Sequence, residues 1–234
     1  MNEKQIILIT GTRKGIGRFL VEHYTSLGHQ VIGCSRNETE YSIDNYQHFC
    51  LDVCDEKDVK RMFSQIRKSY GRLDILINNA GIASKNHALL TAIDTVHEIL
   101  NTNVVGAILF CREGVKLMKK NNFGRIVNFS SVHIPFSTIG TSIYGASKAS
   151  LEQFSKVLAR EVFSFGITIN VLAMSVVENS GMAKDITENI IVEILDKTIS
   201  KSKLDHDDIT HTIDFLIRRE SKMITGQILN LGGF

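Results

Sequence analysis

The sequence predicts an α/β fold: a doubly wound parallel sheet of about seven strands, with helices on both faces. Three observations lead to this prediction. Short apolar runs rich in β-branched residues alternate with segments of helical periodicity along the whole chain. The first apolar run ends at a glycine-rich loop that opens a helix. No linker, repeat or low-complexity segment divides the 234 residues, so we expect a single domain over residues 1–234.

The first βαβ unit carries the candidate cofactor loop. A buried strand is predicted at 5–10, a helix that ends near Gly28, and a second strand at 30–34. Glycines between the first strand and the helix let the backbone approach a pyrophosphate. The helix N-terminus offers that group free N–H donors and the positive end of a dipole. The cofactor-binding candidates in the loop are Gly11, Arg13, Lys14, Gly15, Ile16 and Gly17.

The end of the second strand indicates which dinucleotide binds. An acidic residue about 20 residues after the glycines would bind the ribose 2′-hydroxyl of NAD. This chain has Ser35 and Arg36 there, with Arg13 and Lys14 in the loop. A guanidinium can bind a 2′-phosphate in bidentate fashion, so the sequence predicts NADP(H). The alternative is that Arg36 is a solvated loop residue.

The remaining elements follow in order. Residues 37–46 are polar and too few for the full helix that usually joins parallel strands. Residues 175–202 are predicted to form a polar loop with helices. We expect further strands at 46–51, 73–77, 125–129, 167–172 and 227–231, and helical segments at 55–70, 91–120, 142–165 and 207–218.

Tyr144 and Lys148 form the candidate catalytic pair. They are four residues apart in a predicted helix, so both side chains point to one side of it. A neighbouring cation favours the phenolate, so we expect Lys148 to lower the pKa of Tyr144. Ser131 supplies a hydroxyl that could hold a substrate oxygen beside the tyrosine. Taken alone, the spacing also fits an exposed tyrosine and lysine on a helix.

Composition excludes several other classes. The formal net charge is +2, and the absence of a basic run argues against a nucleic-acid partner. The four cysteines lack metal-ligand spacing, so we expect no metal and four reduced thiols. The apolar runs are too short for a secretory signal or a membrane span. We therefore expect a cytoplasmic protein.

Over nearly its whole length the chain resembles the short-chain dehydrogenase/reductase family, whose members have a Rossmann fold. Each motif is weak by itself, but their order and spacing together are specific. The chain is most similar to the branch that contains the bacterial β-ketoacyl (3-oxoacyl) carrier-protein reductases. The motifs are TGTRKGIG (10–17), Asp52-Val53, NNAG (78–81), Asn103, Ser131, YGASK (144–148) and the closing TGQILNLGG.

The resemblance implies a role for each catalytic candidate. Tyr144 would donate a proton to a carbonyl oxygen, or remove one from an alcohol, and Ser131 would orient the carbonyl. Lys148 would tune Tyr144 and bind the nicotinamide ribose, and Asn103 would kink its helix and hold a water in a proton relay. A capping or surface amide is the alternative for Asn103. The resemblance also implies cofactor contacts by Asp52, Val53, Asn79, Ala80, Gly81, Tyr144 and Lys148.

One departure from the family pattern lies after the sixth strand. The family usually has Pro-Gly there and then a Thr that contacts the carboxamide, where this chain has Met174, Ser175 and Asn179. Asn179 can still hydrogen-bond an amide, so it remains a cofactor-binding candidate. The substrate lid is expected at about 175–202, with Met182 and aliphatic residues of 186–195 as its apolar cover.

A second departure concerns the partner. Carrier-protein reductases are thought to dock their partner through two arginines near the active-site mouth, and this chain has Asn122 and Phe165 at those places. A carrier-protein thioester is therefore a weakened possibility beside a small ketone or a keto sugar. A different class of function is a silent NADP-binding sensor or assembly subunit. The family also implies a homotetramer built through the helices near 95–120 and 142–165.

Overall fold

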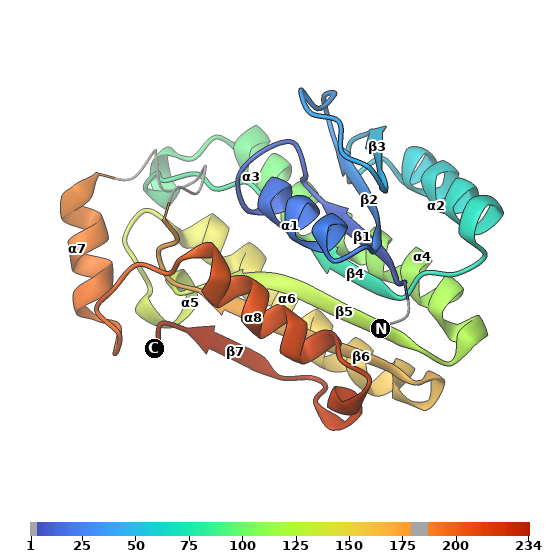
Figure 1. The fold of residues 1–234 in the computed structure, drawn as a ribbon. Coiled ribbons are helices and arrows are strands. Elements are labelled where there is room, and N and C mark those ends of the chain that lie inside the picture. The colour runs from blue at the N-terminus through green and yellow to red at the C-terminus, as the bar shows by residue number, and fades with distance from the viewer. Residues whose placement is uncertain (1–3, 179–186) are drawn as a thin grey trace.

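The computed structural model describes residues 4–178 and 187–234, and these contain one seven-stranded parallel sheet (Figure 1). The strand order is β3-β2-β1-β4-β5-β6-β7, which confirms the predicted fold class. The strands are β1 (Ile6–Thr10), β2 (Gln30–Ser35), β3 (Tyr46–Cys50), β4 (Ile75–Asn78), β5 (Gly124–Ser131), β6 (Ile167–Met174) and β7 (Ile228–Leu231).

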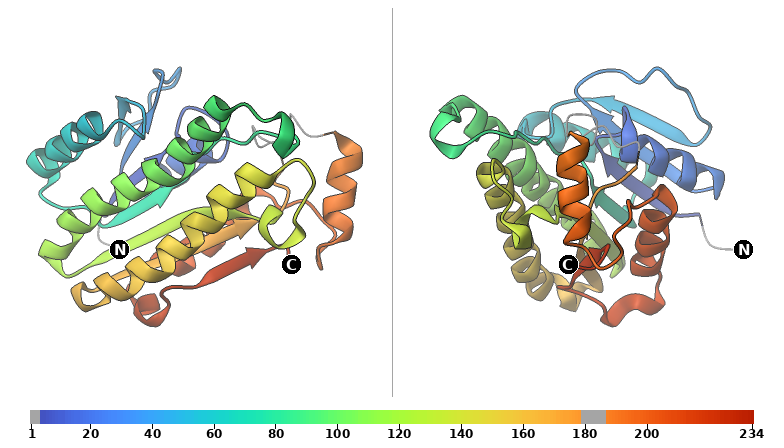
Figure 2. Two further views of the ribbon diagram at one scale, coloured as in Figure 1. Left: turned by 180° about the vertical axis from the view of Figure 1, so that it is seen from behind. Right: turned by 90° about the vertical axis from the view of Figure 1, so that its left-hand side faces the viewer.

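Helices cover both faces of the sheet (Figures 1 and 2). Helices α1 and α8 pack on one face and share a core with it, while α2, α4 and α6 pack on the other. The helices are α1 (Gly15–Ser26), α2 (Glu56–Tyr70), α3 (Ile93–Leu100), α4 (Ala107–Met118), α5 (His133–Phe136), α6 (Ser142–Val162), α7 (Glu188–Asp196) and α8 (His206–Ile217), with short turns η1 (Ala88–Leu90), η3 (Lys119–Asn121), η4 (Phe163–Phe165) and η6 (Glu220–Met223).

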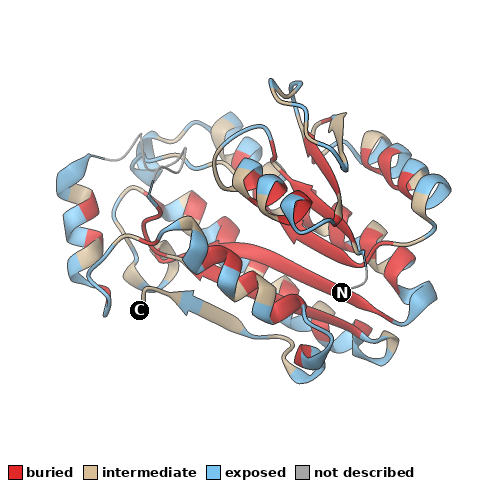
Figure 3. Cartoon of the chain, viewed as in Figure 1, coloured by how far each residue is buried: buried red, intermediate tan, exposed pale blue. Residues whose placement is uncertain are grey.

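The central strands are buried on both faces (Figure 3). Every residue of β1, β4 and β5 is buried, whereas the edge strands β3 and β7 are only partly covered. Parallel strands enclosed by helices are expected to be continuously apolar, and this explains why the run IILIT was readable as a strand. The two edge strands are less covered because one side of each lacks a neighbouring strand.

The sheet order reverses between β1 and β4, and this positions the site. The chain proceeds from β1 outward to β3, then returns to place β4 on the other side of β1. Their carboxyl ends lie side by side, since Ile9 pairs with Ile77. Open parallel sheets form a ligand crevice at such a reversal. Helix α7 stands beyond the same end of the sheet (Figures 1 and 2).

The predicted helix at 91–120 is interrupted by a π-helical segment, η2 (Asn101–Gly106), between α3 and α4. Such segments are rare and occur frequently at functional sites. Helix α2 has the predicted ends: Asp55 caps its first turn, and Gly71 ends it with a φ of +70°. No helix in the described ranges is both long and apolar enough to cross a membrane.

Candidate active site

A cavity of about 560 Å³ opens at the carboxyl ends of the central strands. It brings together most of the residues that the sequence singled out, although they are far apart along the chain. Gly17 and Asn103 do not line it, and Asn179 lies outside the described residues. The predicted residues in its wall are Gly11, Arg13, Lys14, Gly15, Ile16, Ser35, Arg36, Asp52, Val53, Asn79, Ala80, Gly81, Ser131, Tyr144 and Lys148.

The glycine loop is fixed to the neighbouring strands by hydrogen bonds. The N–H of Gly11 donates to the carbonyl of Cys34 at 2.8 Å, and the amide of Asn79 donates to the carbonyls of Thr10 and Gly11 at 2.7 and 3.1 Å. A Cβ at Gly11 would lie 2.9 Å from the Cα of Ala80, so only glycine allows this close approach. Asn79 therefore holds the loop as well as lining the cavity.

The N-terminus of α1 faces the cavity through Lys14, Gly15 and Ile16. The capping position, Lys14, has extended backbone geometry and its side chain makes no capping hydrogen bond. The first turn also has no acidic residue. The N–H groups and positive dipole end of this helix are thus available to an anionic group in the cavity.

Ser35, Arg36 and Asn37 form the far wall, at the end of β2. The Arg36 side chain is 64% exposed, and its Nη1 lies 3.8 Å from the Glu98 carboxylate. An exposed pair at this distance contributes little to stability. The guanidinium is therefore free to exchange Glu98 for a ligand.

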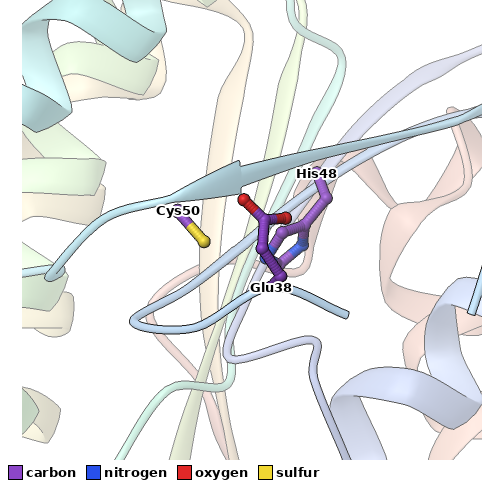
Figure 4. Close-up of side chains that lie close together, drawn as sticks. All are labelled: Glu38, His48 and Cys50. Carbon is purple, nitrogen blue, oxygen red and sulfur yellow. The ribbon is translucent and has the colours of Figure 1, made fainter. Parts of the chain in front are cut away.

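Three side chains of metal-ligand types come together from β3 and the loop that precedes it (Figure 4). The ligand atoms of Glu38, His48 and Cys50 lie within 4.8 Å of one another. Both ring nitrogens of His48 already have partners: the Tyr46 hydroxyl is 2.8 Å from Nδ1, and the Ser35 hydroxyl is 3.1 Å from Nε2. Because both nitrogens are engaged, we assign His48 to holding the end of β2 against β3.

Helix α6 presents Tyr144 and Lys148 to the cavity from one side, as their spacing predicts. Both are buried, with exposed fractions of 6% and 3%. The Lys148 ammonium donates to the carbonyl of Phe129, at 2.8 Å, and lies 5.8 Å from the centre of the Tyr144 ring. The alternative of an exposed helical pair is therefore wrong for these residues.

The pKa of Tyr144 differs from the expectation. Burial raises it above its ordinary value, and a hydrogen bond with Ser131 lowers it in part. Lys148 has no resolved influence on that pKa, so the expected lowering by Lys148 is not found in this structure. Burial lowers the pKa of Lys148 itself to about 8. The physical reason is that the phenol is desolvated, while the Lys148 ammonium donates to the Phe129 carbonyl.

Asn103 is buried beneath the cavity, in the π-helical segment. Its amide exchanges two hydrogen bonds with the backbone of Ile82, each 2.9 Å long, and also donates to the Ser147 hydroxyl at 3.0 Å. That hydroxyl in turn donates to the carbonyl of Tyr144. Asn103 therefore connects the loop after β4 to the first turns of α6, and the alternative of a surface amide is wrong.

A buried polar chain holds α6 against the sheet below the catalytic pair. The amide of Asn78 donates to Asn128 at 2.7 Å, and the amide of Asn128 donates to Ser155 at 2.8 Å. Ser155 completes the chain by donating to the carbonyl of Leu151. Buried hydrogen bonds between side chains restrict how neighbouring elements can sit. Asn78 is the last residue of β4 and Asn128 lies within β5, three residues before Ser131, so this chain helps to position the residues that follow them.

Several cavity residues were not predicted from the sequence. His133, two residues after Ser131, meets the edge of the Tyr144 ring with centroids 5.8 Å apart. Its position in the loop after Ser131 was the available signal. Ser175 lies at one of the family departures. It is 9% exposed, and its hydroxyl has no hydrogen-bond partner in the described part of the chain. The others on this side include Ile82, Ser84, Lys85, Val132, Thr138, Thr141, Val176, Val177, Ile190 and Ile194.

The two positions that replace the docking arginines have structural roles. Asn122 adopts left-handed backbone geometry, with φ of +49°, at the end of η3. The Lys119 ammonium lies over the Phe165 ring, 4.0 Å from its centre. Neither residue lines the cavity. Of the predicted apolar cover, Ile190 and Ile194 of α7 line the cavity, and Met182 lies outside the described residues.

Comparison with known proteins places this geometry in a family. A family model described as short chain dehydrogenase matches residues 5–191. The 3-oxoacyl-(acyl-carrier-protein) reductase FabG of Salmonella typhimurium is 32% identical, and the match covers 99% of this chain and 97% of that protein.

Two solved structures have the same fold. ElxO with NADP bound has a TM-score of 0.88 at 28% identity, covering 98% of this chain and 97% of that chain. A short chain dehydrogenase from Leptospira borgpetersenii with bound NAD+ has a TM-score of 0.89 at 24% identity, covering 99% and 92%. The family match over residues 5–191 and the full-length relative agree with the site, and the chain belongs to the short chain dehydrogenase family.

Proposed function

We propose that this protein is an NADP(H)-dependent oxidoreductase that reduces a carbonyl to an alcohol, or catalyses the reverse, with Tyr144 as general acid or base. The convergence of Ser131, Tyr144 and Lys148 on one cavity, opposite the glycine loop, is the observation that carries the proposal. Gly11 and Arg36 line the same cavity. Nucleotide and substrate could therefore lie in one continuous space.

The residues of the cavity fit a nicotinamide dinucleotide. The uncapped N-terminus of α1 suits a pyrophosphate, and Arg36 with Arg13 and Lys14 suits a 2′-phosphate. The unpartnered Ser175 hydroxyl is a further sign that an occupant with hydrogen-bonding groups belongs here, because an unpaired buried hydroxyl costs about 1–3 kcal/mol. Asp52, Val53 and residues 79–81 would complete the wall around the dinucleotide.

The protein's own groups account for the proton. Because burial raises the pKa of Tyr144, the phenol is protonated at neutral pH and can donate to a carbonyl oxygen. Ser131, hydrogen-bonded to Tyr144, is placed to hold the same oxygen. Lys148, whose pKa burial lowers to about 8, lies 5.8 Å from the centre of the Tyr144 ring and would bind the nicotinamide ribose. A bound nicotinamide cofactor supplies or accepts the hydride.

Asn103 would act as a positioning residue in this mechanism. Its hydrogen bonds to Ile82 and Ser147 connect the cofactor wall to the turn that carries Tyr144. The expected water relay to Lys148 remains part of the proposal. The π-helical segment that contains Asn103 supports it, since an irregular helix exposes carbonyl groups that could bind a water.

A 3-oxoacyl thioester is the substrate class that the FabG relative favours. Against a carrier-bound thioester stand Asn122 and Phe165, neither of which offers a positive charge to a carrier protein. A small ketone or keto sugar is the alternative. The wall contains the apolar residues Val176, Ile190 and Ile194, which fit an acyl chain or a small ketone better than a sugar.

Three further expectations belong to this proposal. We infer a single domain over residues 1–234, in which α7 contributes the described part of the substrate lid. We expect a homotetramer, as the family resemblance implies, and a cytoplasmic location. Exposed apolar residues on α6 and η2, including Val157 at 46% and Val105 at 40%, support the idea of a contact face there.

The proposal is tested with Tyr144→Phe. This change should reduce turnover of any accepted carbonyl by about a thousandfold or more, because proton transfer by a positioned group typically contributes that much. NADPH affinity, measured by fluorescence titration, should stay within about twofold, since the ring is retained. Undiminished turnover would exclude Tyr144 as the acid. Wild-type protein that binds NADPH but reduces no carbonyl in a broad panel would favour the silent sensor or assembly subunit.

A further inference from the structure

The substrate side of the cavity is electrostatically one-sided. Among the described residues that line the cavity, Asp52 is the acidic one, and it lies at the cofactor end with Leu51 and Val53. On the substrate side the wall contains Lys85 and His133. Apart from these two residues and Lys148, whose ammonium already donates to the Phe129 carbonyl, the wall there is mainly aliphatic or carries hydroxyl groups. Among the described residues of the wall, no carboxylate faces the Lys85 charge. A neutral ketone would not use such a charge.

Lys85 and His133 are brought together by two loops joined through their backbones. The N–H of Asn86 donates to the carbonyl of Gly140 at 2.9 Å, which fixes the loop after β4 to the turn before α6. A Cβ at Gly140 would lie 3.4 Å from the Lys85 Cγ, so the lysine stem packs directly on that turn. Lys85 is thereby held at the cavity although it lies on an exposed loop.

His133 is held from the same turn. Its Nδ1 lies 3.0 Å from the Thr138 hydroxyl, and the carbonyl of Thr138 accepts from both the N–H and the hydroxyl of Thr141, at 3.2 and 2.7 Å. When the Thr138 hydroxyl donates to Nδ1, the ring proton resides on Nε2, so the imidazole is a second hydrogen-bond donor. The ring also packs edge-to-face with the Tyr144 ring, with centroids 5.8 Å apart, so the imidazole lies beside the proposed acid.

The charges around the pair are accounted for. Burial, and after it the Lys85 charge, lowers the pKa of His133. The hydrogen bond and charge of Lys197 lower the pKa of Glu193, with a smaller contribution from Lys85, so Lys85 lies within electrostatic reach of both groups. Glu193 is engaged by Lys197, whose ammonium lies 2.9 Å from its carboxylate. The Lys85 ammonium makes no ion pair within 4 Å in the described residues. Lys85 is therefore available to a ligand.

We propose that Lys85 and His133 form a subsite for an anionic group of the substrate, a carboxylate or a phosphate remote from the reacting carbonyl. This inference rests on the proposed carbonyl reductase function and adds the substrate class. Lys85 acts as the cation, and His133 donates a hydrogen bond on the Tyr144 side. A keto acid would bring a carboxylate, and a phosphopantetheinyl thioester would bring a phosphate without the need for a carrier protein.

The test uses pairs of carbonyl compounds that differ in charge. One pair is 4-oxopentanoate and its methyl ester, and the other is the acetoacetyl thioester of phosphopantetheine and that of N-acetylcysteamine. Wild-type protein with NADPH should show a kcat/KM for the anionic member at least about tenfold above that for the neutral one, as expected for one charge-assisted hydrogen bond. The pair that shows the preference identifies the anion as carboxylate or phosphate.

Variants then assign the preference. Lys85→Met should reduce the anionic-to-neutral ratio by about tenfold, mainly through KM, and Lys85→Arg should retain it. His133→Phe should reduce the ratio less, because it removes a neutral donor. Lys68→Met, at an exposed position on α2, is the matched control and should not change the ratio. Glu193→Gln tests the alternative that Lys85 acts only by attracting the Glu193 carboxylate of α7. Equal effects of Glu193→Gln and Lys85→Met on both members of a pair would overturn the proposal.

Binding separates this proposal from the reductase assignment. In the NADPH-loaded Tyr144→Phe protein, calorimetry should show tighter binding of the anionic probe, and Lys85→Met should remove the difference. Equal affinity for both members of each pair, or no binding of either anionic probe, would overturn the subsite. If Tyr144→Phe is inactive while the wild type reduces neutral and anionic compounds equally, the reductase assignment stands and the subsite fails. If Tyr144→Phe keeps full turnover, the reductase mechanism fails.

Discussion

The side chain of Asn103 and the backbone of Ile82 form a reciprocal pair of hydrogen bonds, each 2.9 Å long. The amide donates to the Ile82 carbonyl and accepts from the Ile82 N–H, as a neighbouring strand would. A side chain thus replaces backbone pairing just beyond the end of β4. The loop that continues to Lys85 begins at this point, so the cofactor wall and the proposed anion subsite have a common anchor.

Replacing Asn103 by alanine should lower both stability and turnover. The change leaves two backbone groups of Ile82 without their partner, and we expect a loss of about 2–4 kcal/mol in the free energy of unfolding. Urea denaturation followed by circular dichroism measures it. Asn101→Ala, at an exposed position of the same segment, is the control and should cost less than about 1 kcal/mol. Equal losses for the two variants would contradict the structural role.

The glycine at position 17 should not tolerate even a methyl group. A Cβ there would press on the carbonyl oxygen of Gly11 and lie 2.7 Å from the Asn79 amide nitrogen. Gly17→Ala should therefore displace the loop and weaken NADPH binding by about tenfold or more. Fluorescence titration measures the affinity. Gly145→Ala is the matched control, because the nearest atom to its Cβ is 3.8 Å away, and it should bind NADPH normally.

Lys148→Met should abolish turnover and stabilise the protein. Burial lowers the pKa of Lys148 from 10.5 to about 8, so the folded state binds this proton less tightly than the unfolded state does. The penalty is fully present below pH 8 and disappears as the pH rises toward 10.5. We expect a gain of about 1–3 kcal/mol at pH 7, reduced by the lost hydrogen bond to Phe129. Chemical denaturation at pH 7 and pH 10 measures this difference.

The control for this change is Lys156→Met, at an exposed position of the same helix. It should leave stability within about 0.5 kcal/mol of the wild type at both pH values. A Lys148→Met protein that is less stable than wild type at pH 7 would show that the charge is compensated in the fold.

Arg36→Ala should shift cofactor preference rather than abolish binding. Loss of a guanidinium facing a 2′-phosphate should raise the KM for NADPH by about tenfold or more and leave the KM for NADH nearly unchanged. Steady-state kinetics with both cofactors measures the ratio. Glu98→Gln removes the negative charge 3.8 Å from Arg36, so NADPH binding should be unchanged or improved. Parallel losses for both cofactors would exclude Arg36 from selection.

The exposed apolar residues of α6 predict the effect of a charge on assembly. Val157 is 46% exposed on that helix, and Val157→Glu should dissociate a tetramer because a buried carboxylate in an apolar contact is costly. Light scattering after gel filtration measures the mass. Leu27→Glu, at a 56% exposed position after α1, is the control and should not change the mass. A monomeric wild-type protein would contradict the expectation of a tetramer.

The sequence by itself determined the fold class and the order of the elements, and most of its candidate residues line one cavity. The apolar run of β1 is conspicuous because a central parallel strand is buried on both faces, and this made it readable as a strand. The glycine loop and the Tyr144–Lys148 spacing were readable because both depend on local geometry, within one turn or one helix. Candidate residues at the carboxyl ends of neighbouring parallel strands, such as Asn79 after β4 and Ser131 in β5, meet at one edge of the sheet.

The tertiary structure alone decided what surrounds those residues. The pKa of Tyr144 could not be predicted, because burial and the direction of the Lys148 ammonium depend on how α6 sits against the sheet. The partners of Asn103 and the proximity of Lys85 to His133 depend on contacts between loops that are far apart in the sequence. A single sequence carries the propensity of each loop but not the packing between loops, and that packing determines which charges face the substrate.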